Sequence, residues 1–116
     1  TGPDARFKNP PGVAVSPDGG TVYVADTSNF RIRKIDTSGG AATTLAGSAT
    51  DGFADGTGTA ASFHEPFGVA VSPDGGTVYV AGGSNHRIRK IDTPGGATTT
   101  LAGSDTSGSA DGTGTA

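Results

Sequence analysis

Two histidines are the side chains of this sequence best suited to bind a transition metal or to transfer a proton. They are His64 and His86, and imidazole is a common protein ligand for zinc. In an assembly with threefold symmetry each histidine would occur three times around one axis, a geometry that binds a metal if the rings converge. The chain consists of two similar halves, however, and the first half has Phe30 where the second has His86. We therefore predict exposed loop histidines and no metal site.

An acidic, glycine-rich stretch, DGFADGTG at residues 51–58, could supply carboxylates to calcium. Calcium requires six to eight oxygen ligands, and Asp51 and Asp55 are the only carboxylates of this stretch. The matching stretch of the second half, SGSADGTG at residues 107–114, lacks one of the two. Turn formation explains such Gly- and Asp-rich residues better than calcium binding does, and we predict no cofactor.

Charged residues also occur where an ion pair could join neighbouring strands. Asp26 precedes RIRKI at residues 31–35, so its carboxylate could pair with Arg31 or Arg33, and we take Asp26–Arg31 as the candidate pair. Gly82 replaces Asp26 in the second half, which indicates a structural rather than a catalytic pair. The repeated RIRKI is followed each time by an aspartate, which favours a solvated strand edge over a basic patch.

Composition excludes several classes of function. The net charge is −3, with eight basic and eleven acidic residues, whereas nucleic-acid binding requires a basic face. No apolar run approaches the roughly 18 residues that a membrane span needs, and the first residues, TGPDARF, lack the features of a signal peptide. There is no cysteine, and no Ser–His–Asp grouping is repeated. We predict no nucleic-acid or membrane partner and no enzymatic activity; the compartment is not determined by the sequence.

The elements that position these residues are arranged in a tandem repeat. GVAVSPDGGTVYVA occurs at residues 12–25 and again, unchanged, at residues 68–81, and aligning residues 1–60 with 57–116 gives 46 identical positions. A period of this size is typical of repeat architectures, in which one unit cannot bury its own apolar face. We take residues 1–56 and 57–116 as the two units.

Each unit is predicted to form four short strands. In the first unit they are GVAVS (12–16), TVYVA (21–25), RIRKI (31–35) and ATTLA (42–46), and the intervening PDGG and DTSGG are tight turns. The second unit repeats them over about residues 68–102. Both faces of the strands are apolar or small, which is typical of a sheet packed on both sides. The pattern predicts an all-β fold of four-stranded antiparallel sheets stacked as β-propeller blades.

The motifs also carry a family resemblance. PFGVAVSPDGGTVYVAGGSNHRIRKID at residues 66–92 strongly resembles the NHL repeat, and the first copy at residues 10–36 resembles it almost as well. The linker ADGTGTAASFHEP at residues 54–66 is similar to the connection between blades of long NHL repeats. The resemblance implies a propeller of six blades and an Asp–Arg link that orders the blade. NHL propellers serve as protein scaffolds, as RNA binders and occasionally as enzymes, so the resemblance does not fix a function.

Two blades leave one apolar sheet face bare at each end, and such faces mark association surfaces. We expect head-to-tail closure into a ring, with three chains and six blades favoured and four chains second. Phe63 and Phe7 are expected to anchor the long linker by packing near the start of each blade. The expected core and interface residues are Val13, Val15, Val22, Val24, Ile32, Phe63, Val69, Val71, Val78, Val80 and Ile88.

Two functions are consistent with these features. The first is a self-assembling structural module without catalytic activity, engineered or excised from a repeat protein, because the two copies differ so little. The alternative is a natural recognition module that binds a peptide or another ligand on the face carrying the TSNF (27–30) and GSNH (83–86) loops. A binding face normally carries aromatic or Arg anchors, and these loops are mostly small and polar.

Overall fold

The apolar runs of the first unit form one antiparallel sheet. In the computed structural model, which describes residues 7, 12–48, 50–52, 54–82, 87–93 and 95–103, the strands are β1 (Gly12–Val15), β2 (Thr21–Asp26), β3 (Arg31–Asp36) and β4 (Ala42–Ala46). Their order in the sheet is β1-β2-β3-β4. The short turns allow each strand to pair with its predecessor, as predicted, and β2 leads into β3 through a 3-10 turn, η2 (Thr27–Asn29).

The second unit forms a sheet with one strand more than predicted. Its strands β6 (Pro66–Val71), β7 (Thr77–Gly82), β8 (Arg87–Asp92) and β9 (Ala97–Gly103) repeat the first sheet. A further strand, β5 (Gly56–Thr57), pairs with the outer edge of β9 and is followed by a 3-10 turn, η3 (Gly58–Ala60). The sequence predicted a linker without a strand here. A strand that pairs with an open sheet edge through backbone hydrogen bonds needs no apolar side chains, so the sequence pattern does not reveal it.

The hairpin turns explain the repeated PDGG. Asp18 accepts hydrogen bonds from Ser16 Oγ at 2.6 Å and from the Gly20 amide at 2.9 Å, and Gly19 has a φ of 75°, which glycine adopts without strain. These hydrogen bonds lower the pKa of the Asp18 carboxyl below its ordinary value. Asp74 makes the same contacts in the second sheet, and its pKa is lowered in the same way.

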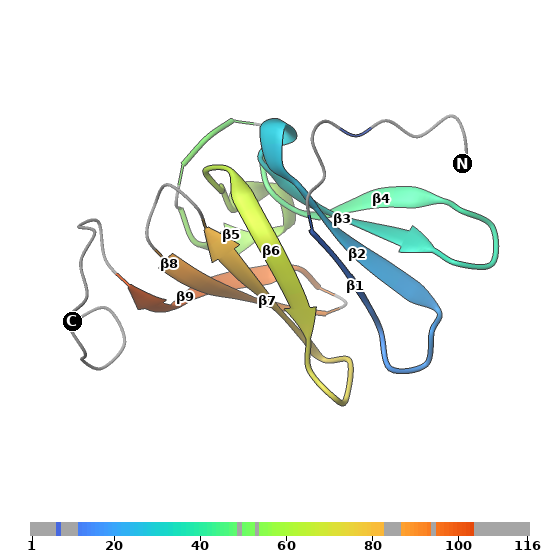
Figure 1. Ribbon diagram of the computed structural model, residues 1–116. Coiled ribbons are helices and arrows are strands. Elements are labelled where there is room, and N and C mark those ends of the chain that lie inside the picture. Colours follow the sequence, from blue (N-terminus) through green and yellow to red (C-terminus); the bar gives the residue numbers. More distant parts are fainter. Residues whose placement is uncertain are drawn as a thin grey trace.

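The core lies between the two sheets, which stand side by side (Figure 1). The first sheet packs through the face that carries Tyr23, Ala25 and Ile32. The second sheet packs through the face that carries Val78 and Val80, which in repeat terms is the other face of the sheet. Each sheet therefore packs one face against the other sheet, and the two opposite faces are exposed in part, at Val13 and Val15 on the first sheet and at Tyr79 and Ile88 on the second. The residues that form this core, with those partly buried against it, are Tyr23, Ala25, Ile32, Leu45, Ala46, Ala61, Phe63, Val69, Val71, Val78, Val80 and Ile91.

Backbone and side-chain hydrogen bonds also join the sheets. Gly58, in the linker, accepts from the amide of Gly47 at 3.1 Å and donates its own amide to the carbonyl of Gly96 at 3.0 Å. Gly47 follows β4, and Gly96 lies between β8 and β9. Thr27 Oγ1 donates to the carbonyl of Pro66 at 2.7 Å. The linker is thus hydrogen-bonded to both sheets. Among the described residues no helix is long and apolar enough to cross a membrane.

Candidate interaction faces

The outer face of the second sheet, which we define as the side turned away from the first sheet, exposes residues that are buried in the first. The two sheets have the same residue at each of these positions. The difference in burial therefore comes from the neighbouring sheet, which covers these residues in the first sheet but not in the second. The exposed fractions are 6% for Tyr23 against 38% for Tyr79, 0% for Ile32 against 43% for Ile88, and 4% for Leu45 against 44% for Leu101. The outer face of the second sheet therefore has the residue types of a packed core but is not covered by another sheet of the chain.

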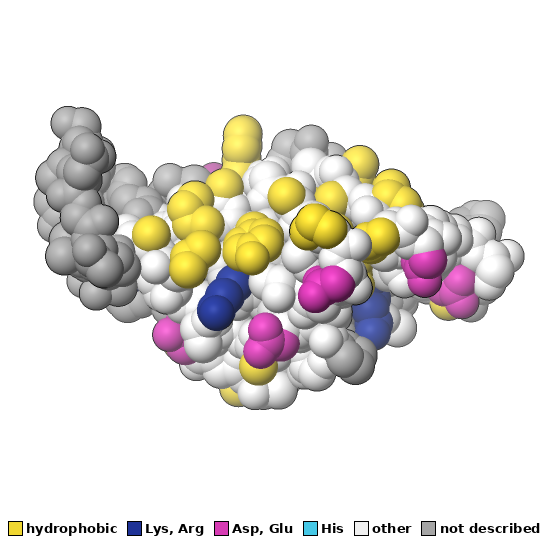
Figure 2. Space-filling view, turned by 90° about the horizontal axis from the view of Figure 1, so that it is seen from below, with side chains coloured by type: hydrophobic (Ala, Val, Ile, Leu, Met, Phe, Trp, Pro, Cys, Tyr) yellow, Lys and Arg dark blue, Asp and Glu magenta, His cyan; other side chains and the backbone are white. Residues whose placement is uncertain are grey.

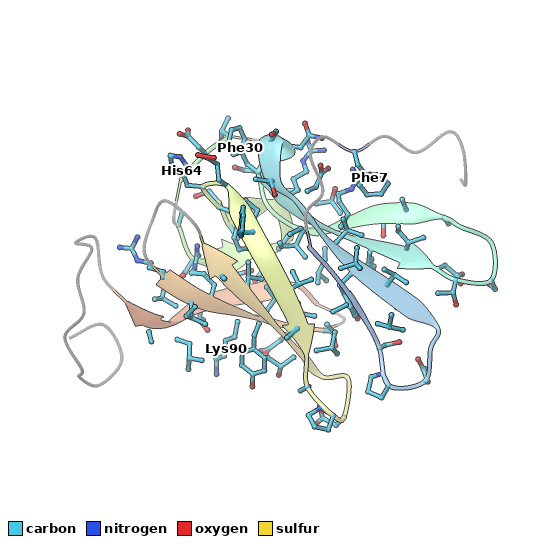
Figure 3. The ribbon with its side chains drawn as sticks, in the orientation of Figure 1. Phe7, Phe30, His64 and Lys90 are labelled. Atoms are coloured by element: carbon cyan, nitrogen blue, oxygen red, sulfur yellow. The ribbon has the colours of Figure 1, made fainter. Side chains whose placement is uncertain are left out.

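This outer face is hollowed. A shallow apolar depression of about 260 Å³ lies over Gly68, Ala70 and Ala81, beside Tyr79 and Ile88. Its lining combines the small residues Gly68, Ala70 and Ala81 with larger ones, so it has room for side chains from a facing sheet. Lys90 projects from the same side of the sheet, away from the first sheet (Figure 3).

The outer face of the first sheet has exposed valines in place of a depression. Val13 is 63% exposed and Val15 is 55% exposed, whereas their counterparts Val69 and Val71 pack against the core. The exposed valines project from the short edge strand β1, next to the partly buried Val22 on β2. Seen from below, hydrophobic side chains gather in a band across the molecule, with charged side chains along one side of that band (Figure 2).

The fit between the two sheets depends on one close backbone approach. A Cβ added at Gly12 would lie 2.8 Å from the carbonyl oxygen of Phe67 and 3.2 Å from the Cα of Gly68, so only glycine allows β1 to approach β6 this closely. At Gly68, the counterpart of Gly12, the nearest atom to an added Cβ is Ala81 Cβ at 4.0 Å. The Gly68 position is therefore open within the chain, whereas the Gly12 position is closely packed.

An arginine lies at the centre of the joint between linker and second sheet. Arg89 is fully buried; its Nη1 donates to the carbonyl of Ser62 at 3.0 Å, and its Nη2 donates to the carbonyl of Ala54 and to Asp55 Oδ1, each at 2.9 Å. Its guanidinium stands over the ring of Phe63, with Cζ 5.1 Å from the centroid. Burial lowers the pKa of Arg89, and Asp55 opposes that effect. Phe63 is buried in the core beneath this guanidinium.

The equivalent arginine of the first sheet is Arg33, whose Cζ lies 5.0 Å from the centroid of the Phe7 ring. Asp26 Oδ2 accepts from Arg33 Nη1 at 3.1 Å and from Asn29 Nδ2 at 3.0 Å. The ion pair therefore falls on Arg33 and replaces the pair expected with Arg31. In the strand register Arg31 lies opposite Asp26, but adjacency of strand positions does not determine which long side chain reaches the carboxylate.

One loop edge carries His64 and Asp51, two of the polar residues that the sequence singled out. His64 lies between two carboxylates, with Nδ1 3.7 Å from Asp51 Oδ2 and Nε2 3.3 Å from Glu65 Oε1. Its ring meets that of Phe30 edge to face, with centroids 6.5 Å apart (Figure 3). Phe30 and Glu65 have φ values of 59° and 50°, which are unusual for residues other than glycine. His86 and the rest of the GSNH loop lie outside the described residues.

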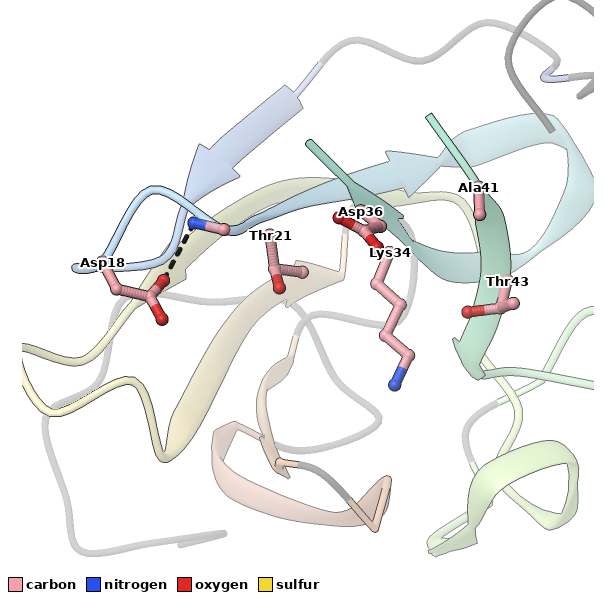
Figure 4. A pocket seen from close by; sticks show the side chains of 7 residues that line it. Asp18, Thr21, Lys34, Asp36, Ala41 and Thr43 are labelled. Carbon is pink, nitrogen blue, oxygen red and sulfur yellow. Dashed lines mark hydrogen bonds between the residues drawn. The ribbon is translucent and has the colours of Figure 1, made fainter. Parts of the chain in front are cut away.

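A polar cavity of about 450 Å³ lies against the first sheet at its other end, beside the turns that join β1 to β2 and β3 to β4 (Figure 4). Lys34 projects into it beside Thr21 and Thr43, and the carboxylates of Asp18 and Asp36 lie at its rim. Ser38 donates to Asp36 through its amide and its hydroxyl, and these hydrogen bonds lower the pKa of that carboxyl. The carboxylates thus serve their own turns, and in the part of the chain that the structure describes no three His, Asp or Glu side chains could hold a metal together.

The structure thus divides the expected core and interface residues into three groups by their burial. Ile32, Phe63, Val78 and Val80 are buried in the core, Val24 is buried, and Val22, Val69 and Val71 are partly buried; Val13, Val15 and Ile88 are exposed. Sequence reasoning missed the role of Arg89. A signal for it exists, because Phe7 and Phe63 have the same spacing from their arginines, 26 positions along the chain in both repeats.

Comparisons with known proteins identify the repeats. Residues 4–105 match the family described as SMP-30/Gluconolactonase/LRE-like region. Human NHL repeat-containing protein 2 is 34% identical over 92 residues, which are 78% of this chain but 13% of that protein, so the chain spans a small part of this relative.

Solved structures share the arrangement of sheets. A protein of unknown function from Bacteroides thetaiotaomicron superposes with a TM-score of 0.68 and 30% identity, over 75% of this chain and 22% of that one. A chain in the crystal structure of a nidogen/laminin complex superposes with a TM-score of 0.63 and 22% identity, over 81% of this chain and 31% of that one. This chain belongs to the SMP-30/gluconolactonase/LRE-like family, and its two repeats are β-propeller blades of the NHL type.

Proposed function

We propose that the chain is a structural module that assembles with further copies of itself through its two outer faces. The observation that carries this proposal is the exchange of burial between the repeats. Each outer face displays one half of the joint that the two sheets make with each other inside the chain. The valines of one copy would fill the depression on the next copy, as Val69 and Val71 pack against the first sheet internally.

Such a contact is heterologous, because it joins two different surfaces, and it closes into a ring if the rotation per copy permits. Propellers have about four to eight blades. The number of blades that the NHL resemblance implies, six, favours three chains; four chains and eight blades are the second choice. With 11.2 kDa per chain, a trimer has three times that mass, 33.6 kDa. The 46 identical positions of the two repeats are consistent with a recently amplified or engineered sequence.

Light scattering across a range of protein concentrations tests this proposal. We expect an assembly of the wild-type chain near the trimer mass, and loss of the assembly in Val13→Asp. Val13 is the informative position because it is exposed within the chain, so the substitution leaves the single chain folded, whereas a charge at the buried Val78 would disrupt the core. Gly39→Asp is the matched control, because a side chain at Gly39 meets open space.

A wild-type chain that stays monomeric at about millimolar concentration would refute the proposal. An assembly that Val13→Asp leaves intact while its circular dichroism is unchanged would show that another surface is used. Loss of assembly in Gly39→Asp as well would point to net charge, rather than to the outer faces, as the cause.

We further propose that the chain has no enzymatic activity. The name of the matching family includes gluconolactonase, so hydrolysis of a lactone is the activity to test. The support is the chemistry of the described residues: the carboxylates at the cavity rim are engaged by their own turns, and His64 faces carboxylates but no nucleophile. We expect no hydrolysis of gluconolactone above the buffer rate, with or without added divalent cations. A rate that depends on His64 would overturn this.

Recognition of a peptide at the loop edge is the alternative function. What favours it is the pair of left-handed, non-glycine residues, Phe30 and Glu65, on either side of His64, since backbone strain is concentrated at binding sites. A peptide selected from a displayed library against the chain should then lose its binding in the double variant Phe30→Ala, His64→Ala. Peptides that bind the variant as well as they bind the wild type would exclude this edge.

A further inference from the structure

We propose that the polar cavity of the first sheet binds a small molecule with one carboxylate and two ammonium groups, which is the chemistry of a basic amino acid such as lysine. The inference goes beyond the proposed self-assembly and does not depend on it, because the described residues that line the cavity belong to one sheet of one chain. With about 450 Å³ the cavity has the size of pockets that hold small ligands.

The cavity lies on the face of the first sheet that is turned toward the second sheet. Lys34 lies opposite Tyr23 in the register of β2 and β3, and opposite Thr43 in that of β3 and β4. Because Tyr23 packs in the core between the sheets, Lys34 lies on the same covered face. Lys34 is only partly exposed and projects into the cavity (Figure 4). Its charge is therefore screened less than that of a lysine on an open surface.

The cavity offers one cation to a ligand. Within the part of the chain that the structure describes, Lys34 forms no ion pair, although Asp18 and Asp36 line the same cavity. An ammonium group has three N–H donors, and hydrogen bonds from it to a carboxylate are among the strong ones. The hydroxyls of Thr21 and Thr43 line the same cavity (Figure 4) and can donate to the same carboxylate.

Two carboxylates at the rim each keep one oxygen for a ligand. Asp18 accepts from Ser16 and from Gly20 through Oδ1. Asp36 accepts from the amide and the hydroxyl of Ser38, also through Oδ1. These hydrogen bonds lower the pKa of both carboxyls, so both are ionised at neutral pH. Among the described residues no hydrogen bond reaches either Oδ2 atom, and each of these oxygens can accept from an ammonium group.

The charges of the cavity discriminate between classes of ligand. One ammonium and two carboxylates, +1 and −2, give the lining a net charge of −1. A phosphate or a dicarboxylate would bring further negative charge to the two carboxylates, and like charges brought together cost binding free energy. A neutral sugar would leave all three charges without a partner of opposite sign. A ligand with one carboxylate and two ammonium groups pairs every charge with an opposite one.

The second sheet supplies an internal control. Each of the seven lining residues has an identical counterpart 56 positions later in the chain. Lys90, the counterpart of Lys34, is exposed on the outer face of the second sheet, where no sheet of the chain stands opposite it. The two sets of residues therefore have the same chemistry, and only the set of the first sheet lies beside an opposing sheet.

A titration of the isotope-labelled chain with L-lysine, followed by amide chemical shifts in NMR, tests the proposal. The sample is kept at a concentration where light scattering reports single chains. Saturable shifts are expected at the amides of Gly20 and Ala41. The amides of their counterparts, Gly76 and Ala97, should stay unchanged.

Matched variants locate the binding. Lys34→Gln should weaken the binding of L-lysine by at least about tenfold, as expected when a hydrogen bond to a charged group is lost. Lys90→Gln is the control and should bind as the wild type does. Asp36→Asn keeps the Oδ1 acceptor of its turn and should also weaken binding, with Asp92→Asn as its control. Circular dichroism spectra equal to that of the wild type show that the variants are folded.

Analogues of lysine show which charges are recognised. L-Lysinamide lacks the carboxylate, and Nα-acetyl-L-lysine lacks the α-ammonium group and represents the C-terminal lysine of a peptide. Both should bind at least about tenfold more weakly than L-lysine, and glucose and inorganic phosphate should give no saturable shift. Equal binding of Nα-acetyl-L-lysine and L-lysine would overturn the free amino acid as the ligand and assign the site to the end of a peptide.

Three results would overturn the proposal as a whole. The first is the absence of saturable shifts at L-lysine concentrations well above about 1 mM. The second is binding that both Lys34→Gln and Asp36→Asn leave unchanged. The third is a set of shifts equally large in the two repeats of single chains, which would show non-specific attraction to the repeated charges. A chain that never assembles would refute the proposed function and leave this test unaffected.

Discussion

Ile32 and Ile88 form an internal matched pair, because they occupy the same repeat position in the same sequence environment. Ile32 is fully buried and Ile88 is 43% exposed. Replacing isoleucine with alanine removes three carbons, which contribute about 0.8 kcal/mol each when fully buried. With about 1 kcal/mol for the cavity that remains, Ile32→Ala should lower the free energy of unfolding by about 3.4 kcal/mol. Because Ile88 is partly exposed, Ile88→Ala should lose only a little over half of this transfer free energy and leave no cavity. It should therefore lower the free energy of unfolding of a single chain by about 1.4 kcal/mol.

The assay is urea denaturation followed by circular dichroism at two protein concentrations. At a concentration where light scattering reports single chains, the two variants should differ by about 2 kcal/mol. At a concentration where the chain assembles, the proposed contact would cover Ile88 with a neighbouring copy. The cost of Ile88→Ala should then approach that of Ile32→Ala, because binding adds stability by mass action.

Equal destabilisation by both variants in single chains would refute the assignment of the two faces. A constant difference of about 2 kcal/mol at every concentration, in a sample that assembles, would show that the outer face of the second sheet takes no part in the assembly. Ile91→Ala, at a fully buried position in the second sheet, should be costly at both concentrations and controls for a general weakness of that sheet.

Three further predictions follow from the contacts described. Gly12→Ala should destabilise the single chain by about 1–3 kcal/mol, since its Cβ would meet the carbonyl oxygen of Phe67, whereas Gly68→Ala should leave single-chain unfolding unchanged and weaken assembly in light scattering. Arg89→Lys should lower the free energy of unfolding in urea by about 2–4 kcal/mol, because one ammonium cannot replace two buried nitrogens and their stacking. The lowered pKa of Asp18 stabilises the fold above its ordinary value of 3.8, and this contribution is lost as the pH falls through the lower folded value; in urea titrations at about pH 6 and pH 2.5, removal of its main hydrogen bond by Ser16→Ala should reduce that acid loss.

The strands could be predicted from the sequence almost to the residue. The apolar runs at residues 12–16, 21–25, 31–35 and 42–46 coincide with β1–β4 to within one residue at each end. This succeeds because turns with strict chemistry, such as PDGG, bound each run. It also explains why the antiparallel pairing of neighbouring strands was predictable.

The packing of faces could not be predicted in the same way. Both faces of β2 are apolar, so the alternation of residues does not reveal whether Val24 or Tyr23 turns toward the second sheet. Only the three-dimensional joint shows that Tyr23 does so. Likewise β5 was missed, because two residues of glycine and threonine carry no periodicity, and their pairing depends on the open edge of β9.

The hydrogen bonds of Gly58 have a consequence for how the chain opens. One peptide segment accepts from Gly47, beside the first sheet, and donates to Gly96, within the second. The linker is thus held by both sheets at once, and we expect this coupling to make the two repeats open together rather than one after the other. In hydrogen exchange the amides of Gly47 and Gly58 should therefore exchange only through the global opening reaction, at the rate of the central strand amides.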